Sequence, residues 1–502
     1  MFVNTFWSLV PPIVAIGLAL LTKETYSSLF IGIVVGALLA TDFSPIGALD
    51  TIINDGLTAA IADNAGIFLF LVILGVMVAL VNATGGSAAF GRWAASHIHS
   101  KAGALLATFA LGVLIFIDDY FNCLTVGSVM TPVTDSQRIS RVKLAYLIDA
   151  TAAPICMIAP ISSWAAAVSG VAAKLDTGVS GIQLFIEAIP YNFYSLLTIV
   201  FVITMVVLGV DYGPMAAAEL KAAQTGDLGA LSEEQEEGSS RANMWDMLIP
   251  IILLIIFCVI GLIYVGGFWD PETNAGDFIA AFGDTDAFVG LPWGALIALV
   301  LSIIYLCARR VITFKGAMGC MTKGFYAMVP AILILTFAVS LKSMTGLLGA
   351  ADYVEGLMKQ ASEGLFMLLP AIIFVVACLL AFATGTSWGT FGILIPIVLP
   401  IFNAAPDLQI MGISACLAGA VCGDHCSPIS DTTIMASAGA NCNHIDHVST
   451  QIPYAVTVAA ICFVNYILAA FIRNVVISLA IGVVMVIGTL LVIRSVQSRK
   501  TA

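Results

Sequence analysis

The sequence predicts an all-α integral membrane protein, with about eleven transmembrane helices plus two re-entrant hairpins in inverted repeats. Composition is the first observation, because 60% of the 502 residues are hydrophobic and only 10% are charged. Soluble domains hold about 25% charged residues, and the mean hydropathy of +1.05 also fits a chain that lies in lipid. The second observation is a series of long apolar runs, and the third is a set of polar interruptions within such runs.

The apolar runs are mostly near the length of about 20 residues that crosses a bilayer as a helix. They cover residues 6–21, 26–41, 66–83, 193–210, 247–266, 290–308, 327–341, 452–472 and 475–493. The first run lacks the basic flank and small-residue cleavage site of a signal peptide, so we expect a retained helix. The cysteines lie mostly within apolar segments and are expected to be small buried hydrophobic residues.

Lysine and arginine in short loops indicate which side of the membrane is cytoplasmic. Basic residues cluster at 92–101, 138–143, 309–315 and 494–500, and these positions should be cytoplasmic. The loops at 42–64 and 267–289 carry acids and neither Lys nor Arg, which fits the outside. This pattern predicts a multi-pass protein of a prokaryotic inner membrane with its N-terminus outside and its C-terminus in the cytoplasm.

Two apolar stretches are too short for two crossings and are interrupted in the middle. Residues 103–134 are broken by DDYFN at 118–122 and have basic clusters at both ends, so both ends should face the cytoplasm. Residues 366–403 are broken by TGTSWGT at 384–390, but acidic flanks place their ends outside. We interpret both as re-entrant hairpins of opposite orientation, which membranes tolerate where protein or water surrounds the tip.

The two halves of the chain also align weakly in sequence. Pro132 and Pro400 differ by 268 positions, as do the tripeptides Pro-Ile-Ser at 160–162 and 428–430. Inverted repeats with interrupted helices are the architecture of many secondary transporters, whose sites lie where the repeats meet. The predicted organisation is N-terminal helices at 1–60, a first repeat at 61–210, an acidic cytoplasmic linker at 211–245, connecting helices at 246–325, a second repeat at 326–472 and a C-terminal helix with a basic tail at 473–502.

Carboxylates within the interrupted segments are candidate functional groups, because an intramembrane carboxylate costs roughly 2.5–3.5 kcal/mol on insertion scales. The candidate cation- or proton-binding residues are Asp118, Asp119, Asp149, Asp424 and Asp431. The alternative is that these acids cap the ends of half-helices or pair with a base such as His425. His425 itself is expected either to carry a proton or to orient Asp424 or Asp431 by a hydrogen bond.

Hydroxyl and amide side chains in the same segments could complete a coordination shell. The supporting candidates are Asn122, Ser162, Ser163, Thr384, Thr386, Ser387, Thr390, His425, Ser427, Ser430, Thr432 and Thr433. These are hard oxygen ligands for the most part, which suit Na+ rather than a transition metal. Burial and like charge raise carboxylate pKa values in general, so protons and Na+ would compete for one site.

Two other features admit simpler interpretations. The segment CNHIDH at 442–447 resembles a metal-binding box, but a structural or pH-responsive role at the membrane edge is favoured over zinc. Lys342 lies near the outer end of its helix, where it either reaches the membrane surface or serves as an internal counter-ion. The net charge of -12 and the absence of a basic face give no support to a nucleic-acid partner.

The motifs GDHCSPISDTTIMAS and GANCNHIDHVSTQIPYA resemble the signature of the NhaC-type Na+/H+ antiporter family, and ATGTSWGTFGILIPI is similar to its second hairpin. The resemblance extends over most of residues 60–470. It implies membership of the ion transporter superfamily, a homodimer, and a scaffold domain beside a transport domain that moves as an elevator. Relatives of this kind exchange Na+ and H+, malate and lactate, or amino acids.

The sequence therefore predicts a Na+/H+ antiporter that needs no cofactor beyond the transported ions. The alternative is a Na+-coupled or proton-coupled transporter of a small organic solute, either an amino acid or a carboxylate. A passive channel is a further alternative. An intramembrane enzyme that uses Ser430, His425 and Asp431 is disfavoured, because a one-sided catalytic site does not explain interruptions in inverted topology. The linker at 211–245 is expected to be a solvated tether.

Overall fold

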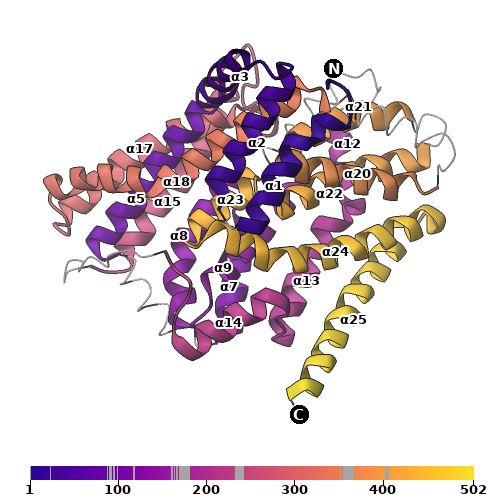
Figure 1. Ribbon diagram of the computed structural model, residues 1–502. Coiled ribbons are helices and arrows are strands. Elements are labelled where there is room, and N and C mark those ends of the chain that lie inside the picture. Colours follow the sequence, from indigo (N-terminus) through magenta and orange to yellow (C-terminus); the bar gives the residue numbers. More distant parts are fainter. Residues whose placement is uncertain are drawn as a thin grey trace.

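Helices form every regular element in the part of the chain that the computed structural model describes (Figure 1). The described residues are 2–22, 24–86, 89, 93, 97–98, 100–116, 119–159, 162, 164–165, 168, 181–231, 242–350, 352–353, 367–401 and 406–501. Within these ranges no strand occurs, and Ala230 and Cys442 form an isolated bridge. The all-helical class predicted from composition is confirmed.

Every predicted apolar run forms helix. In chain order the elements are η1 (Phe6–Leu9), α1 (Val10–Thr22), α2 (Thr25–Ala40), α3 (Pro45–Thr51), the π-helix η2 (Ile52–Thr58), α4 (Ala59–Asp63), α5 (Ala65–Thr84), α7 (Lys101–Leu114), α8 (Asp119–Ser136), α9 (Arg141–Thr151), α10 (Ala153–Cys156), α12 (Gly181–Ala188), η3 (Ile189–Tyr191), α13 (Phe193–Leu208), α14 (Gly213–Thr225), α15 (Trp245–Val265), α16 (Phe278–Gly283), α17 (Ala287–Ala308), α18 (Phe314–Leu347), α20 (Leu369–Thr384), α21 (Ser387–Ile401), α22 (Pro406–Cys426), α23 (Asp431–Gly439), α24 (His444–Ile472) and α25 (Val475–Thr501). All eleven cysteines are free thiols, as expected for small buried residues.

Local sequence signals set the ends of the helices that surround the site. Ser100 caps α7 by accepting the N–H of Gly103, and Ser140 caps α9 by accepting the N–H of Lys143. Helix α13 ends where Gly209 adopts a left-handed conformation with φ of 63°. These residues set where α7 and α9 begin and where α13 ends, and therefore where the polar loops with their charged residues lie.

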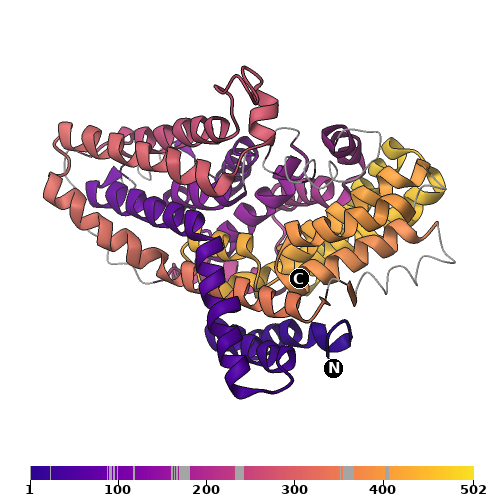
Figure 2. The ribbon, with the colours of Figure 1, turned by 90° about the horizontal axis from the view of Figure 1, so that it is seen from above.

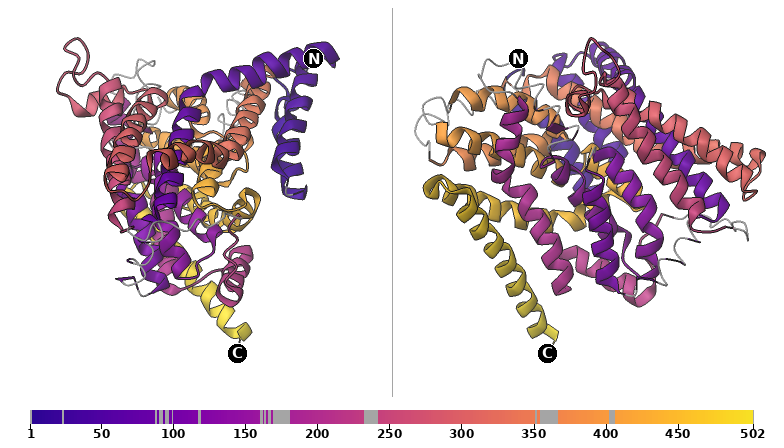
Figure 3. Two further views of the ribbon diagram at one scale, coloured as in Figure 1. Left: turned by 90° about the vertical axis from the view of Figure 1, so that its left-hand side faces the viewer. Right: turned by 180° about the vertical axis from the view of Figure 1, so that it is seen from behind.

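Helices α5, α15, α17 and α18 form one group, seen at the left of Figure 1 and from above in Figure 2. Glycines allow the backbones of this group to approach closely. A Cβ added at Gly75 would lie 2.4 Å from the carbonyl oxygen of Gly324, and one at Gly261 would lie 2.3 Å from that of Gly290. Small residues at helix contacts are the usual means of association in lipid. Helices α1 and α2 extend this group on one side (Figure 3).

A second group contains the two interrupted stretches. Helices α7 and α8 pack against α9, and helices α20 and α21 pack against α22. Helix α23 joins the two sets, because it follows and contacts α22 and also packs against α8 and α9. A Cβ added at Gly127 of α8 would lie 2.4 Å from the backbone of Gly439 at the end of α23. The polar interruptions of the two halves therefore lie in one body of helices.

The first part of the predicted linker is a folded helix rather than a solvated tether. Glu219 of α14 is 5% exposed and accepts hydrogen bonds from the backbone N–H and the hydroxyl of Ser140, at 2.8 and 2.6 Å. Lys101 also pairs with Glu219. Glu219 of α14 thus contacts Lys101 at the start of α7 and Ser140 at the start of α9. This segment therefore crosses one end of the second helix group. The acidic run at 232–237 lies outside the described residues.

The segment 42–64 was expected to be a loop, but most of it is helical. Helices α3, η2 and α4 follow one another from Pro45 to Asp63. Ser44 caps this segment by accepting the N–H of Gly47, and Pro45 occupies the first turn, where its missing N–H is not needed. Acidic residues kept this stretch from being recognised, although they lie on its exposed face: Asp50, Asp55 and Asp63.

Five helices in the described part of the chain are long and apolar enough to cross a membrane. They cover Ala65–Thr84, Trp245–Val265, Phe288–Ala308, His444–Ile472 and Val475–Gln497. The number rises to seven if each of two bent pairs is one span. One pair joins α12 to α13 with a bend of 46°, and the other joins α22 to α23 with a bend of 49°. The second bend contains the candidate site.

Candidate functional site

The break between α22 and α23 is held open by side chains within it. Pro428 has no N–H to continue the helix. Ser427 Oγ donates to the carbonyl oxygen of Phe382 at 2.8 Å, and Ser430 Oγ accepts the N–H of Thr433 at 3.3 Å, so that Ser430 caps α23. These side-chain hydrogen bonds stabilise the break, where the backbone does not continue the hydrogen bonding of a helix.

The tip between α20 and α21 touches this break directly. Gly385 ends α20 with φ of 64°, and a Cβ there would lie 2.5 Å from the carbonyl oxygen of Ile429. Ser387 begins α21 and donates to Asp424 Oδ2 at 2.7 Å. The structure thus brings together two of the predicted motifs, one from the hairpin and one from the α22–α23 break.

Asp424 and Asp431 form the centre of the site. Asp424 is 2% exposed, and among the described residues its Oδ1 has no hydrogen-bond partner. Asp431 lies at the start of α23, where its Oδ2 accepts the hydroxyl of Tyr120 from α8 and its Oδ1 accepts the N–H of Thr432 at 2.9 Å. The two carboxylates are close enough to interact electrostatically. The buried carboxylate of Asp424 beside the half-buried carboxylate of Asp431 is suited to bind a cation or a proton.

The predicted hydroxyl groups divide into two sets. Ser430 and Thr432 bond to each other at 2.9 Å, and Thr433 Oγ1 lies 3.4 Å from the carbonyl oxygen of Asp424. These hydroxyls lie around the carboxylates with Ser387 and Ser427. Thr384 and Thr390 instead donate within their own helices, each at 2.8 Å to a backbone carbonyl. The hydroxyl of Thr386 accepts the N–H of Gly389 at 3.3 Å.

The corresponding residues of the first hairpin are placed differently. Asp119 starts α8, is 2% exposed and accepts the N–H of Tyr120 at 3.1 Å. The amide nitrogen of Asn122 lies 2.6, 2.9 and 3.1 Å from the carbonyl oxygens of Gly112, Ile115 and Thr151, so this side chain holds helix ends together. Asp118 lies outside the described residues.

Ser162 and Ser163 follow α10, in the segment that corresponds to the α22–α23 break. The hydroxyl of Ser162 donates to the carbonyl oxygen of Cys156 at 2.7 Å and accepts the N–H of Ala165 at 3.1 Å. These bonds support a local turn. Ser163 lies outside the described residues.

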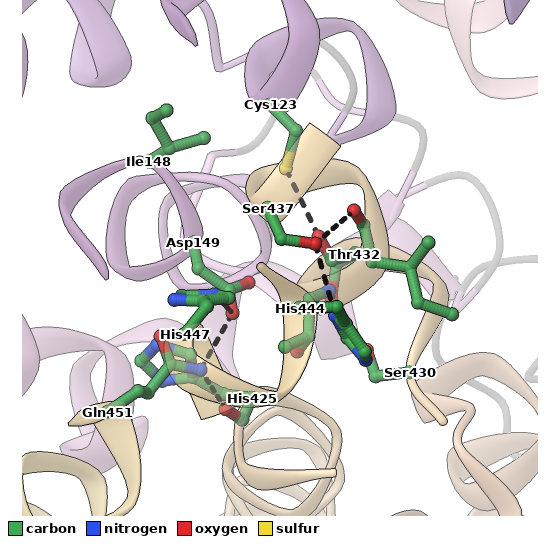
Figure 4. A network of polar contacts seen from close by, with 12 residues as sticks. Cys123, Ile148, Asp149, His425, Ser430, Thr432, Ser437, His444, His447 and Gln451 are labelled. Carbon is green, nitrogen blue, oxygen red and sulfur yellow. Dashed lines mark hydrogen bonds and ion pairs between the residues drawn. The ribbon is translucent and has the colours of Figure 1, made fainter. Parts of the chain in front are cut away.

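Asp149 and His425 bond to groups other than the carboxylate pair, and Figure 4 shows both beside Gln451. Asp149 Oδ2 accepts the side-chain amide of Gln451 at 2.7 Å. The ring Nδ1 of His425 bonds to the hydroxyl of Tyr194 at 2.8 Å, and its backbone oxygen accepts from Gln451. The prediction that His425 orients Asp424 or Asp431 is therefore wrong: its ring turns toward α13, away from the break.

The residues of CNHIDH do not converge. His444 bonds to Ser437 Oγ at 3.0 Å and to the carbonyl oxygen of Pro428 at 2.7 Å, whereas His447 points toward Asp149. Among the residues that the structure describes, no three His, Cys, Asp or Glu side chains are grouped to hold a metal ion. His444 supports the break from behind.

Three polar residues near the site were not assigned from the sequence: Tyr120, Tyr194 and Gln451. Tyr120 lies within the quoted DDYFN motif, so its position beside the acids was a usable signal. Gln451 carries no such signal, since 302 residues separate it from Asp149. Only the packing of α24 against α9 brings the two together.

Lys342 of α18 also reaches the site. Its Cε lies 3.8 Å from the position of a Cβ on Gly389, and its charge acts on Asp431. Leu341 and Met344 on either side of it pack in one cluster with Ile429 and Ile434. Because the side chain is exposed and its charge also acts on Asp431, the geometry is consistent with both the counter-ion and the membrane-surface interpretation.

Comparisons with known proteins agree on transport. Residues 155–471 match the Na+/H+ antiporter family. An uncharacterized protein of Haemophilus influenzae is 37% identical over 486 residues, which cover 94% of this chain and 92% of that protein. Two antiporters are similar at 26% identity: the arginine/ornithine antiporter ArcD of Halobacterium salinarum, over 47% of this chain and 44% of its own, and the malate-2H(+)/Na(+)-lactate antiporter of Bacillus subtilis, over 39% and 42%.

The family match includes both the hairpin 366–403 and the break at Asp424 to Asp431. These two segments contain the carboxylates, the hydroxyls and the close backbone contact described above. The match spans more than half of the chain. The chain belongs to the Na+/H+ antiporter family, a family of multi-pass membrane transporters.

Proposed function

We propose that this protein is a Na+/H+ antiporter in which Na+ and protons compete for the buried carboxylates of Asp424 and Asp431. The observation that carries the proposal is Asp424 Oδ1, a buried carboxylate oxygen without a hydrogen-bond partner beside a second carboxylate. Such an oxygen is expected where a ligand belongs. The hydroxyls of Ser387 and Ser430 and the carbonyl groups of the break are further oxygen ligands of the hard type that Na+ prefers.

Competition at one site gives exchange by a simple argument. A site with neither ion leaves charged carboxylates inside the protein, and moving such a charge through the membrane costs several kcal/mol. A bound cation or proton removes that charge. If only the loaded forms cross, inward movement of one ion requires outward movement of the other. The direction of net transport then follows the two gradients.

The proposal includes an inverted-repeat architecture. Helices α7 and α8 begin at Lys101 and Asp119, and α20 and α21 begin 268 positions later at Leu369 and Ser387. Both stretches therefore break at the same place, in agreement with the weak sequence repeat. We assign the two hairpins to a transport domain that moves beside a scaffold formed by α5, α15, α17 and α18, in a homodimer of the cell membrane.

The orientation of the chain is also a proposal. Lys143 pairs with Asp211, and the side-chain amide of Gln497 donates to the carbonyl oxygen of Asp211 at 2.6 Å, so the basic C-terminal tail lies beside the basic ends of α7 and α9. The positive-inside rule then places this end in the cytoplasm and the N-terminus outside. Asn4 bonds to the carbonyl oxygen of Leu348 at 2.9 Å, which puts the end of α18 outside as well.

A second candidate is coupled transport of a small organic solute with a carboxylate group. Lys342 supports it, since an ammonium beside Asp431 offers both charges that an amino acid would need. The N-terminus of α21 lies at the same tip and favours anionic groups. Similar proteins exchange arginine with ornithine and malate with lactate, as their names state. An enzyme is disfavoured, because Ser430 and His425 bond to Thr432 and Tyr194 and not to each other.

The test uses purified protein in sealed liposomes with a trapped pH dye. Na+, Li+ or K+ is added outside, alone and then with a panel of amino acids and carboxylates. Proton movement on Na+ alone, lost in Asp424→Asn and Asp431→Asn and kept in the exposed control Asp446→Asn, supports the antiporter. Silence with Na+ alone and Na+-dependent uptake of one solute would favour the second candidate. Wild-type kinetics in both Asp→Asn variants would move the site elsewhere.

A further inference from the structure

A second group of buried ionisable side chains lies beside the carboxylate pair (Figure 4). Asp149 of α9 and His447 of α24 face each other with side-chain exposures of 1% and 0%. The distance from His447 Nε2 to Asp149 Oδ2 is 3.4 Å, which is longer than a good hydrogen bond. Gln451, one turn further along α24, donates to the same carboxylate oxygen at 2.7 Å.

This group contains several polar atoms without hydrogen-bond partners. Within the part of the chain that the structure describes, these atoms are Asp149 Oδ1, both ring nitrogens of His447, and Gln451 Oε1. Buried polar groups are bonded in the great majority of cases, so a concentration of unpaired atoms calls for an explanation. His444, on the same helix, shows the ordinary pattern, because both of its ring nitrogens have partners.

We propose that Asp149 and His447 together form a second proton-binding site, distinct from Asp424 and Asp431, that releases its proton when a cation binds to those carboxylates. This inference rests on the antiport function proposed above. With one proton the pair is neutral overall, and without it the pair carries one negative charge. The proton comes from water on one side and returns to water on the other, with no bond formed elsewhere.

A short physical link connects the two sites. The amide of Gln451 donates both to Asp149 and to the backbone oxygen of His425, the residue that follows Asp424. Asp149 and Asp424 also interact electrostatically. A cation that arrives at Asp424 therefore makes the surroundings of Asp149 more positive, and a proton on the pair becomes less stable. Each transport cycle then moves one more proton than a cycle that uses only the site at Asp424 and Asp431.

Other ionisable groups near the pair bear on its proton affinity. From α22 these are Asp424, His425 and Cys426, from α24 His444, from α9 Tyr146, and from α13 Tyr194 through its bond to His425. Among them, the histidine closest in sequence to His447 is His444, whose ring is already fully bonded. Because His444 also bonds to the carbonyl oxygen of Pro428 in the break, the exposed His97 is the control instead.

The experiment separates two activities of the full-length protein in liposomes. Exchange of radioactive Na+ for unlabelled Na+ at equal pH needs no net proton transfer, whereas Na+-driven proton movement does. In Asp149→Asn and His447→Gln we expect proton movement to be lost or its pH profile to be flattened, while Na+/Na+ exchange is retained. The exposed control His97→Gln should keep both activities and the wild-type pH profile.

Three results would overturn the inference: wild-type proton movement in both variants, loss of Na+/Na+ exchange in variants that remain folded by size-exclusion chromatography, and equal effects in the control His97→Gln. If a neutral variant fails to fold, Asp149→Glu decides, because it keeps the carboxyl group and should shift the pH profile of proton movement. An unchanged profile in Asp149→Glu then counts against the site. Absence of Na+/Na+ exchange in the unmodified protein would instead reject the proposed antiport function.

Discussion

Asp424 explains why the site needs a ligand. One of its carboxylate oxygens is bonded to Ser387 and the other is buried without a partner. Leaving a charge in that state is unfavourable by several kcal/mol, so we expect a bound cation or proton to stabilise the carboxylate there. Asp431 differs, since Tyr120 and the N–H of Thr432 already satisfy its oxygens in part. The two acids therefore have unequal roles.

The sequence identified these acids because charge in an apolar segment is visible without a structure. It could not identify their partners. The assignment of His425 to Asp424 or Asp431 rested on closeness in sequence, but the helix turns the ring toward Tyr194. For Asn122, assigned to coordination, spacing gave no sign that the amide nitrogen also bonds to backbone carbonyl oxygens. Side-chain direction depends on tertiary packing, which spacing in the sequence does not reveal.

Gly385 gives a prediction at the scale of one residue. In Gly385→Ala, the positive φ and the contact with Ile429 O should together destabilise the protein by about 1–3 kcal/mol and reduce transport strongly. Thermal unfolding in detergent and the liposome assay would measure both effects.

Gly209→Ala is the matched control for this prediction. Gly209 has φ of 63° and open space where a Cβ would lie, so the substitution tests backbone strain without a clash. We expect a smaller loss of stability and normal transport. Equal losses of stability and transport in Gly385→Ala and Gly209→Ala would contradict the close contact between the α20–α21 tip and the α22–α23 break.

At the scale of elements, α14 and the segments that flank it tie helix ends together. Asp211 precedes α14 and accepts hydrogen bonds from Lys143 of α9 and from the hydroxyl of Tyr454 of α24, the latter at 2.7 Å. Arg141 donates its N–H to the carbonyl oxygen of Leu228 at 2.8 Å. The sequence suggested a tether here because the stretch is polar and acidic. Its partners are basic residues far away in sequence, which the composition alone could not reveal.

Asp211 gives a pH-dependent prediction for this segment. Burial raises the pKa of Asp211, but Lys143 and Tyr454 outweigh it, and the net pKa lies below the ordinary value of 3.8. A lowered pKa stabilises the folded state at higher pH, and this stability is lost as pH falls through the folded pKa. Asp211→Asn should therefore lose about 1–3 kcal/mol at pH 7, with a smaller difference from wild type below about pH 4.

Thermal unfolding measured across this pH range would check the prediction. Asp227→Asn serves as the control, since the pair of Asp227 with Lys221 is solvent-exposed and should contribute little. A constant difference between wild type and Asp211→Asn at every pH would contradict the electrostatic explanation.

For the whole molecule, the sequence predicted the helices better than their arrangement. The apolar runs and the two interruptions lie where expected, because lipid solvent imposes length and composition on each segment. The side-by-side packing of α5, α15, α17 and α18 could not be predicted, since it depends on glycine contacts between segments distant in sequence. The site lies where α8, α18, α21, α22 and α23 meet, so it too depends on that arrangement.

Orientation is the prediction that belongs to this scale. Single cysteines at Ser136 and Asp227 should react with an impermeant reagent from the cytoplasmic side, and one at Asp284 should react from outside; all three positions are exposed. Inside-out and right-side-out vesicles would distinguish the sides. Labelling of Ser136 from outside would contradict the re-entrant hairpin at 103–134, because both ends of that hairpin must face the same side.

The central claim, competition of Na+ and protons at Asp424 and Asp431, is tested most directly by the pH dependence of Na+ transport kinetics in liposomes. On the acidic side of the activity profile, we predict that the apparent KM for Na+ rises by about tenfold or more per pH unit while the maximal rate stays constant. Asp424→Asn should abolish that dependence. A maximal rate that falls with acid at an unchanged KM would show that protons act elsewhere and would contradict the account.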